Sequence, residues 1–330
     1  MSPTVSVLVV TYRCRDVARA CLASLYEATG GVSFEVIVVD NASGDGTEEM
    51  VKEEFPQARL YALEDNIGFG QAVNLAAEHA RGEYVLLLNP DTLVHGGMVE
   101  ELVGFARSLP EPAICGGRTL RPDGRLDPGS CWGAPTLWSL FCFATMLSTA
   151  FKGSRFFDPE SLGGWKRDSV RDVDIVTGCL LLAPRALWLE LGGFDPRFFM
   201  YGEDADLALR AAGAGVRRVI TPNAVVTHEV GVSSETRPDK VLLLFRGKAT
   251  LLRKHWGPVR SRIGVGLLLS GVGLRTLEAL LPGRGSAAGR RRASAWPAVW
   301  RARSDWLRGY PEPSGAEPAS PPLQTEHVSP

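Results

Sequence analysis

Runs of apolar, mostly β-branched residues alternate with helical patterns along the first ninety residues. The runs "VSVLVVTY" and "FEVIVVD" have apolar side chains at successive positions, which predicts strands buried on both faces. This alternation predicts an α/β fold with a doubly wound, parallel sheet. The predicted strands cover 5–12, 34–40, about 58–62 and 83–91, and the predicted helices cover 15–28 and about 69–79.

Polar residues follow the predicted strands at the points where the strands end. Asp40 closes the second strand, Asn66 follows the third, and Asn89 and Asp91 follow the fourth. Ligands of open α/β sheets bind outside the carboxyl ends of the strands. We therefore expect these four side chains to converge on one edge of the sheet.

The pattern changes towards the C-terminus. The apolar run at 136–151 has the length of a buried or interfacial helix, and 239–256 is amphipathic. The run at 263–281 is nearly long enough to span a membrane, but Arg275 and Glu278 interrupt it. We therefore predict a helix that lies on the membrane. The predicted organisation is a catalytic domain at 1–256, a membrane-associating helical extension at 257–310 and a disordered, proline-rich tail at 311–330.

Charge supports this division. Residues 253–308 hold twelve Lys or Arg against Glu278 and Asp305, whereas the whole chain has a net charge of −1. A basic segment on an acidic body favours an anionic membrane surface as partner. The total charge gives no support for nucleic-acid binding. The six cysteines have no CxxC spacing and no leader pattern opens the chain, so we expect a cytoplasmic protein without a zinc site or disulfides.

Three polar positions are candidates for ligand binding. Asp91, helped by Asn89, has the oxygen chemistry that Mg²⁺ or Mn²⁺ prefers, although Asp and Asn also favour turns. Asp40 could bind a base or ribose, with a turn as the alternative. His228 could complete a metal shell, but a lone histidine is more often structural.

An acidic group follows aromatic residues in "FDPRFFMYGEDADLALR", 194–210. Glu203, Asp204 and Asp206 could simply favour a helix N-terminus. That reading leaves the preceding aromatic residues unexplained. A carboxylate beside Phe199 and Tyr201 could have a raised pKa and accept a proton from an alcohol.

Seven motifs in order give a resemblance to a known family. They are "VVTYR", "VVDNASGDGT", "NIGFGQAVN", "LLLNPDT", "TGCLLLAPR", "GGFDPRFFMYGEDADLALR" and "NAVVTHEVGVSS". Together they resemble the family 2 inverting glycosyltransferases of GT-A fold, and more narrowly the bacterial rhamnosyltransferase-like branch. The resemblance covers about residues 4–256 and implies a nucleotide-sugar donor, a divalent Mg²⁺ or Mn²⁺ and a lipid-linked or surface-glycan acceptor.

The resemblance also implies roles for individual residues. Asp204 matches the general base, with Glu203 and Asp206 as supports. "NPD" replaces the usual DxD, so Asn89 stands where many relatives have an aspartate. The residues implied in donor binding are Thr11, Asp40, Asn66, Asn89 and Arg185, and those implied in metal binding are Asp91 and His228.

Two other functions remain open on the sequence. A catalytically inactive nucleotide-sugar-binding protein would share the fold and the donor site. A nucleotidyltransferase would also share the sheet, but it would carry a Gly-rich, basic loop after the first strand, where this chain has "TYRCRD".

Overall fold

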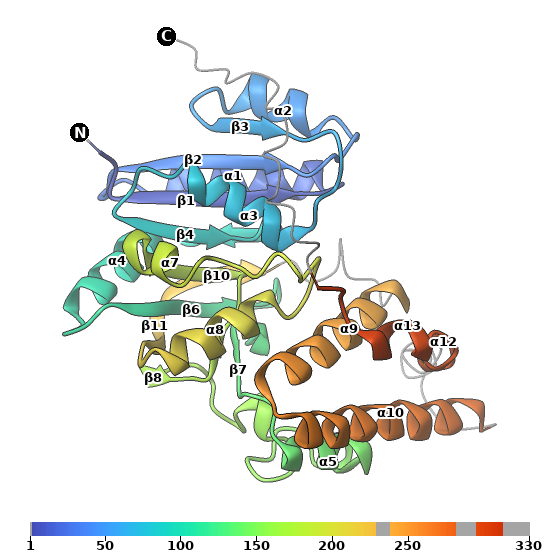
Figure 1. Ribbon diagram of the computed structural model, residues 1–330. Coiled ribbons are helices and arrows are strands. Elements are labelled where there is room, and N and C mark those ends of the chain that lie inside the picture. The colour runs from blue at the N-terminus through green and yellow to red at the C-terminus, as the bar shows by residue number, and fades with distance from the viewer. Residues whose placement is uncertain (1, 229–237, 282–294, 313–330) are drawn as a thin grey trace.

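The structure is a computed structural model that describes residues 2–228, 238–281 and 295–312. The tail predicted from residue 311 lies almost entirely outside the described residues. A mixed sheet forms the centre of the molecule, and a group of helices from the C-terminal part of the chain stands beside it (Figure 1).

The central sheet has the order β3-β2-β1-β4-β10-β6-β11-β5, with β8 paired to β11. The first four strands in this order are parallel, as predicted from the alternating pattern. Strand β10 then runs antiparallel to both β4 and β6. The strands of this sheet are β1 Val5–Thr11, β2 Phe34–Asp40, β3 Arg59–Ala62, β4 Tyr84–Leu88, β5 Thr92–Val94, β6 Ala113–Leu120, β8 Arg171–Asp172, β10 Leu180–Pro184 and β11 Arg217–His228, and a separate pair is formed by β7 Cys131–Trp132 and β9 Ile175–Val176.

Helices cover both faces of the sheet. Val5, Val7 and Val9 of β1 point into one apolar cluster, and Leu8 and Val10 point into the other. The first cluster contains the buried faces of α1, α2 and α4, and the second contains those of α3, α7 and α8. This division explains the continuous apolar run of β1. The helices are α1 Arg15–Ala28, α2 Thr47–Glu54, α3 Phe69–Glu78, α4 Met98–Ser108, α7 Arg185–Glu190 and α8 Glu203–Gly213.

A third apolar cluster joins helices that are far apart in the sequence. The run at 136–151 is not one helix, because the chain breaks between α5 and α6 where Met146 has a φ of 67°. Helix α5 lies alongside α10, and α9, α12 and α13 complete the group (Figure 1). Leu140, Leu252 and Leu268 are buried together with Val299 and Trp306. The helices are α5 Leu137–Ala144, α6 Leu147–Ala150, α9 Pro238–His255, α10 Pro258–Leu280, α12 Trp296–Arg301 and α13 Arg303–Arg308.

Arg275 connects α10 to α5 and α6. Its guanidinium donates to the Phe143 carbonyl at 2.7 Å and to the Thr149 hydroxyl at 2.9 Å, and it stacks on the Phe143 ring. Of the two charges that interrupt the apolar run, Arg275 is thus buried inside the protein, whereas Glu278 is exposed. Helix α10 is long and apolar enough to cross a membrane, but 39% of its most apolar window is buried in the fold. Helix α10 therefore shares a core with α9 and α5.

Candidate functional site

The ends of β1 and β2 form the first part of the site. Thr11 and Asp40 are opposite each other in the strand register, and the Thr11 hydroxyl donates to Asp40 Oδ1 at 2.8 Å. The Ser43 hydroxyl donates to the same oxygen, and its backbone N–H donates to Oδ2 at 3.2 Å. Asp40 is thereby held as a hydrogen-bond acceptor at the carboxyl end of the sheet.

Two loops meet beside this pair. Asn41 Nδ2 donates to Asn66 Oδ1 at 3.0 Å, and Asn41 Oδ1 accepts from the Ile67 backbone at 2.9 Å. Asn66 Oδ1 also accepts from the Gly68 backbone at 2.9 Å. The predicted donor-binding residues Thr11, Asp40 and Asn66 are thus connected through Asn41.

Strand pairing brings Asp91 and His228 together. His228 pairs with Thr92 across β11 and β5, so it lies beside Asp91. The distance from His228 Nε2 to Asp91 Oδ1 is 3.1 Å, and Nδ1 lies 3.0 Å from Asp127 Oδ2. Burial alone would lower the pKa of His228, but the hydrogen bonds to Asp127 and Asp91 outweigh it and raise the pKa to about 9. The histidine is therefore fixed between two carboxylates.

Asp127 is a member of this group that the sequence did not indicate. It is 101 positions away from His228, in the extended segment after β6, and no spacing rule connects the two residues. Its Oδ1 also accepts from the Gly129 backbone at 3.2 Å. Burial would raise the pKa of Asp127, but the hydrogen bond from His228 lowers it. Asp127 orients the imidazole so that Nε2 faces Asp91.

The donor set fits a hard divalent cation that is shared with a substrate. Among the described residues, no group of three or more His, Cys, Asp or Glu side chains is arranged to hold a metal alone. The Asp91 carboxylate and His228 Nε2 lie 3.1 Å apart and offer two ligands once a cation displaces the Nε2 proton. Mg²⁺ in nucleotide enzymes is commonly held by one or two protein ligands, with substrate phosphate oxygens and water at the other positions. The pair can serve such an ion.

The acidic segment begins α8. Gly202 precedes the helix with a φ of 105°, and Glu203 is its first residue. Asp204 Oδ1 accepts from the Ala205 backbone at 2.7 Å, and Oδ2 lies 3.4 Å from the Gly178 backbone nitrogen. Burial raises the pKa of Asp204, and these backbone donors offset the increase only in part. Asp204 is thus partly buried, as expected for a base in a partly dry position.

Glu203 is more deeply buried than Asp204. Its side chain is 5% exposed, and Oε2 has no hydrogen-bond partner among the residues that the structure describes. Burial raises the pKa of Glu203 to about 8, and the negative charge of Asp204 adds to the effect. Of the two neighbours, Asp204 ionises first and Glu203 keeps its proton near neutral pH.

The third acid of the segment is an ion-pair centre. Asp206 is fully buried and contacts Arg210 at 2.8 Å, Lys254 at 2.6 Å and His255 Nε2 at 2.8 Å. Burial would raise the pKa of Asp206, but hydrogen bonds from His255, Lys254 and Arg210 lower it to about 2. Asp206 connects α8 to the end of α9 through these ion pairs and so supports the position of α8.

The loop before α8 contacts the loop at residues 66–69 through backbone atoms. Phe69 N–H donates to the Phe199 carbonyl at 2.9 Å. Gly68 has a φ of 88°, and a Cβ there would lie 2.5 Å from the same carbonyl. The glycine thus permits the close approach of the Phe199 backbone.

Strand β10 links the metal candidates to the candidate base. The Asn89 backbone donates to the Cys179 carbonyl at 3.0 Å just before β10, and the adjacent Gly178 approaches Asp204. Asn89, Asp91, Asp204 and His228 therefore lie around the same end of β4 and β10.

Arg185 lies away from these residues. Because β10 is antiparallel to β4, Leu180 pairs with Leu88, and Pro184 pairs with Tyr84 at the start of β4. The Arg185 backbone donates to the Glu83 carbonyl at 2.8 Å. The side chain thus begins at the amino end of β4, opposite to Asp91, and the structure does not bring it to the other predicted donor-binding residues.

Comparison with known sequences identifies relatives of the chain. The family described as "Glycosyl transferase family 2" matches residues 6–173. The N-acetylglucosaminyl-diphospho-decaprenol L-rhamnosyltransferase of Mycobacterium tuberculosis is 30% identical over 256 residues, which cover 72% of this chain and 80% of the relative. The O-antigen biosynthesis protein RfbC of Myxococcus xanthus is 29% identical, over 70% of this chain and 18% of that protein.

Solved structures share the fold. The mannosyltransferase PcManGT from Pyrobaculum calidifontis, in complex with GDP-Man and Mn²⁺, matches with a TM-score of 0.54 and 21% identity over 93% of this chain and 84% of that chain. GalNAc-T7 with UDP, GalNAc and Mn²⁺ matches with a TM-score of 0.56 and 15% identity, over 94% and 58%. With this fold and these relatives, the chain belongs to glycosyl transferase family 2 and has the GT-A fold.

Proposed function

We propose that the protein transfers L-rhamnose, with inversion, from dTDP-L-rhamnose to a hydroxyl of a lipid-linked or surface-glycan acceptor. The observation that carries the proposal is the arrangement of Asp91, His228 and Asp204 around one end of β4 and β10. The choice of sugar and acceptor is supported by the relative that is named as an N-acetylglucosaminyl-diphospho-decaprenol L-rhamnosyltransferase.

The donor would lie across the ends of β1, β2 and β4. Asp40 accepts hydrogen bonds at the position where a nucleoside would bind, and Asn41 and Asn66 hold the two adjacent loops together. Asn89 and Asp91 follow β4, within reach of a diphosphate. A divalent cation on Asp91 and His228 would stabilise the negative charge of the leaving nucleoside diphosphate.

Asp204 would act on the acceptor. Its carboxylate takes the proton of the acceptor hydroxyl as that oxygen attacks the anomeric carbon and the bond to the diphosphate breaks. The new bond forms on the face opposite to the leaving group, so the configuration inverts. No covalent intermediate with the enzyme is formed, and one carboxylate is sufficient.

A panel of donors tests this proposal. Purified full-length protein is mixed with dTDP-L-rhamnose, UDP-GlcNAc or GDP-mannose, a polyprenyl-diphosphate-linked sugar acceptor, and Mg²⁺ or Mn²⁺. We expect acceptor-dependent release of dTDP and a product of inverted configuration by NMR. Turnover of a different donor would overturn the choice of sugar, and donor binding without turnover of any donor would favour an inactive binding protein.

We further propose that the protein works peripherally at the cytoplasmic face of the plasma membrane. The support is the basic segment 253–308 together with the outer side of α10. Val259, Ile263, Leu274 and Leu277 on that side are between 45% and 67% exposed. Trp306, in contrast, is buried in the helical group and does not contribute to such a surface.

A further inference from the structure

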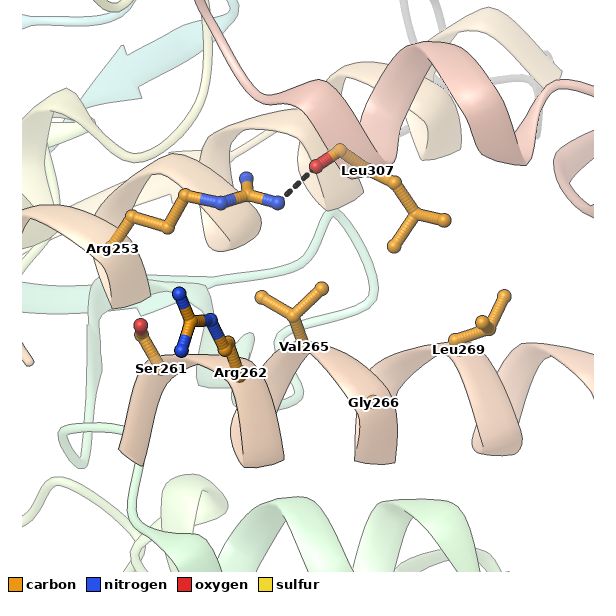
Figure 2. Close-up of a pocket in the computed structure, with 7 residues that line it drawn as sticks. All are labelled: Arg253, Ser261, Arg262, Val265, Gly266, Leu269 and Leu307. Atoms are coloured by element: carbon orange, nitrogen blue, oxygen red, sulfur yellow. Dashed lines mark hydrogen bonds between the residues drawn. The ribbon is translucent and has the colours of Figure 1, made fainter. Parts of the chain in front are cut away.

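A hollow lies between α10 and the helices α9 and α13. Its volume is about 270 Å³, and none of the residues of the candidate catalytic site lines it. This volume is just below the range of about 300–1,000 Å³ that is typical of pockets for drug-sized ligands. Its lining residues are Arg253, Ser261, Arg262, Val265, Gly266, Leu269 and Leu307 (Figure 2).

The hollow is amphipathic along its length. Arg262 and Ser261 lie at one end and the side chains of Leu269 and Leu307 at the other, and the Arg253 guanidinium extends from the polar end to the Leu307 carbonyl (Figure 2). A ligand that fills it would therefore combine an anionic group with an apolar chain.

The two arginines have no acidic partner within the described parts of the chain. Arg253 donates to the Leu307 carbonyl, and Arg262 makes no hydrogen bond or ion pair with any described residue. Burial lowers the pKa of Arg253, as expected for a cation whose charge is not balanced nearby. Arginine carries several N–H donors in a planar group that suits phosphate oxygens. The charge at this end of the hollow is thus complementary to a phosphate.

The mouth of the hollow adjoins an apolar surface. Gly266 is exposed on the same side of α10 as Val259, Ile263 and Leu277. A Cβ at Gly266 would meet no atom within 4 Å, so the backbone is open to contact there. An apolar chain that leaves the hollow would run along this side of α10 without crossing charged side chains.

We propose that this hollow binds the phosphate of an anionic membrane lipid, with the lipid chains extending over Gly266 along the outer side of α10. The site would fix the orientation of the protein on the membrane, beyond the general attraction of its basic segment. It is independent of the donor and of the sugar-transfer reaction.

Two matched arginine variants test the charge. Full-length Arg262→Gln and Arg260→Gln each remove one positive charge from the first turns of α10, but Arg260 stacks on Trp256 and does not line the hollow. Binding is measured by co-sedimentation with phosphatidylcholine vesicles that contain phosphatidylglycerol, and with vesicles of phosphatidylcholine alone. We expect Arg260→Gln to weaken binding by no more than about fivefold, the effect of one charge near an anionic surface, and Arg262→Gln to weaken it by more than about tenfold. Equal losses, or no binding by the wild type, would overturn the site.

A second pair of variants tests the space without changing charge. Gly266→Leu fills the mouth of the hollow, whereas Ser270→Leu adds the same side chain one turn further along the exposed side. We expect only Gly266→Leu to weaken binding of soluble dihexanoylphosphatidylglycerol, measured by calorimetry, with unchanged thermal unfolding.

Equal affinity of the wild type for inorganic phosphate would identify a free-phosphate site and overturn the lipid proposal. Sugar transfer in detergent is expected to stay unchanged in all four variants, which separates this site from the proposed activity.

Discussion

At the scale of single residues, two adjacent carboxyl groups differ in chemistry because of their positions. Glu203 and Asp204 both begin α8, but Glu203 has a buried, unpartnered oxygen and Asp204 is exposed enough to meet a substrate. Burial raises the pKa of both groups, and Glu203 keeps its proton to about pH 8. Asp204 is therefore the accessible one of the two carboxyl groups and the one that ionises first.

Replacing each of these carboxyl groups by its amide separates their roles. Asp204→Asn is expected to lower transfer by about 10²–10⁴-fold, because general-base catalysis is lost. Glu203→Gln changes only a group that is already neutral, so transfer at pH 7 should stay within about threefold of wild type. Initial rates of dTDP release measure both. A drop of the same size in both variants would contradict the assignment of Asp204 as the base.

Glu203 also predicts a dependence of stability on pH. Its pKa in the folded protein, about 8, lies above the ordinary value of 4.5, so its contribution is full below pH 4.5 and is lost as the pH rises towards 8. The wild type should therefore lose stability relative to Glu203→Gln between pH 5.5 and pH 8. Urea unfolding of both proteins in EDTA measures the difference. Parallel pH profiles would show that Glu203 is ionised in the folded state.

Asp127 acts on the proposed metal through His228. Asp127→Asn keeps the size of the side chain but weakens its hold on His228 Nδ1, so Mn²⁺ affinity in the presence of dTDP should fall by about 10–100-fold. Asp123→Asn, in the same segment but paired only with Arg125 at the surface, is the control. Isothermal calorimetry with Mn²⁺ and dTDP gives the affinities. Unchanged binding in Asp127→Asn would show that the pair is only structural.

At the scale of elements, the site depends on how α8 is anchored. Asp206 connects α8 with α9, and the Tyr310 hydroxyl donates to the Met200 carbonyl at 2.6 Å in the loop before α8. A Cβ on Gly247 of α9 would lie 1.9 Å from the Tyr201 carbonyl, so α9 also contacts this loop closely. The position of the candidate base is therefore set in part by helices near the C-terminus.

Removing the charge of Asp206 should weaken this anchor strongly. Asp206→Asn leaves Arg210 without its buried counter-ion and leaves Lys254 with Asp195 alone, and it is expected to cost about 3–5 kcal/mol of unfolding free energy at pH 7. The wild-type contribution is present above pH 3.8 and is lost as the pH falls towards 2. Asp172→Asn, which breaks an exposed pair with Arg217, should cost about 0–1 kcal/mol. Urea unfolding compares the two, and similar losses would contradict the role of Asp206.

At the scale of the whole molecule, local patterns predicted some features and not others. The apolar runs predicted strands β1, β2 and β4 and their parallel order, whereas the place of Thr11 in the site was implied only by the family resemblance. The runs did not predict the position of Arg185, because periodicity shows which residues are buried but not that β10 reverses direction. The contact of Asp127 with His228 joins distant segments and also had no local signal.

The C-terminal helices form part of one helical core with α5 and α9. Truncation after residue 256 uncovers Leu140, Phe245 and Leu252, and each fully buried large apolar side chain is worth about 1.5–3 kcal/mol. The truncated protein should therefore aggregate or unfold at a lower temperature, whereas a chain that ends at residue 312 should behave as the full length does. Size-exclusion chromatography and thermal unfolding measure this. A soluble, fully stable 1–256 fragment would support the predicted separation of the domains.

The backbone contact between the two loops limits which changes of sequence this site can tolerate. The Phe69 N–H donates a hydrogen bond to the Phe199 carbonyl, and Gly68 leaves room for that carbonyl. The spacing between the loop at residues 66–69 and the loop before α8 therefore depends on main-chain atoms. The hydrogen bond itself uses no side-chain atom of Phe199, Met200 or Tyr201. A substitution at the exposed Met200 can therefore change the surface of this loop while the backbone contact between the two loops is kept.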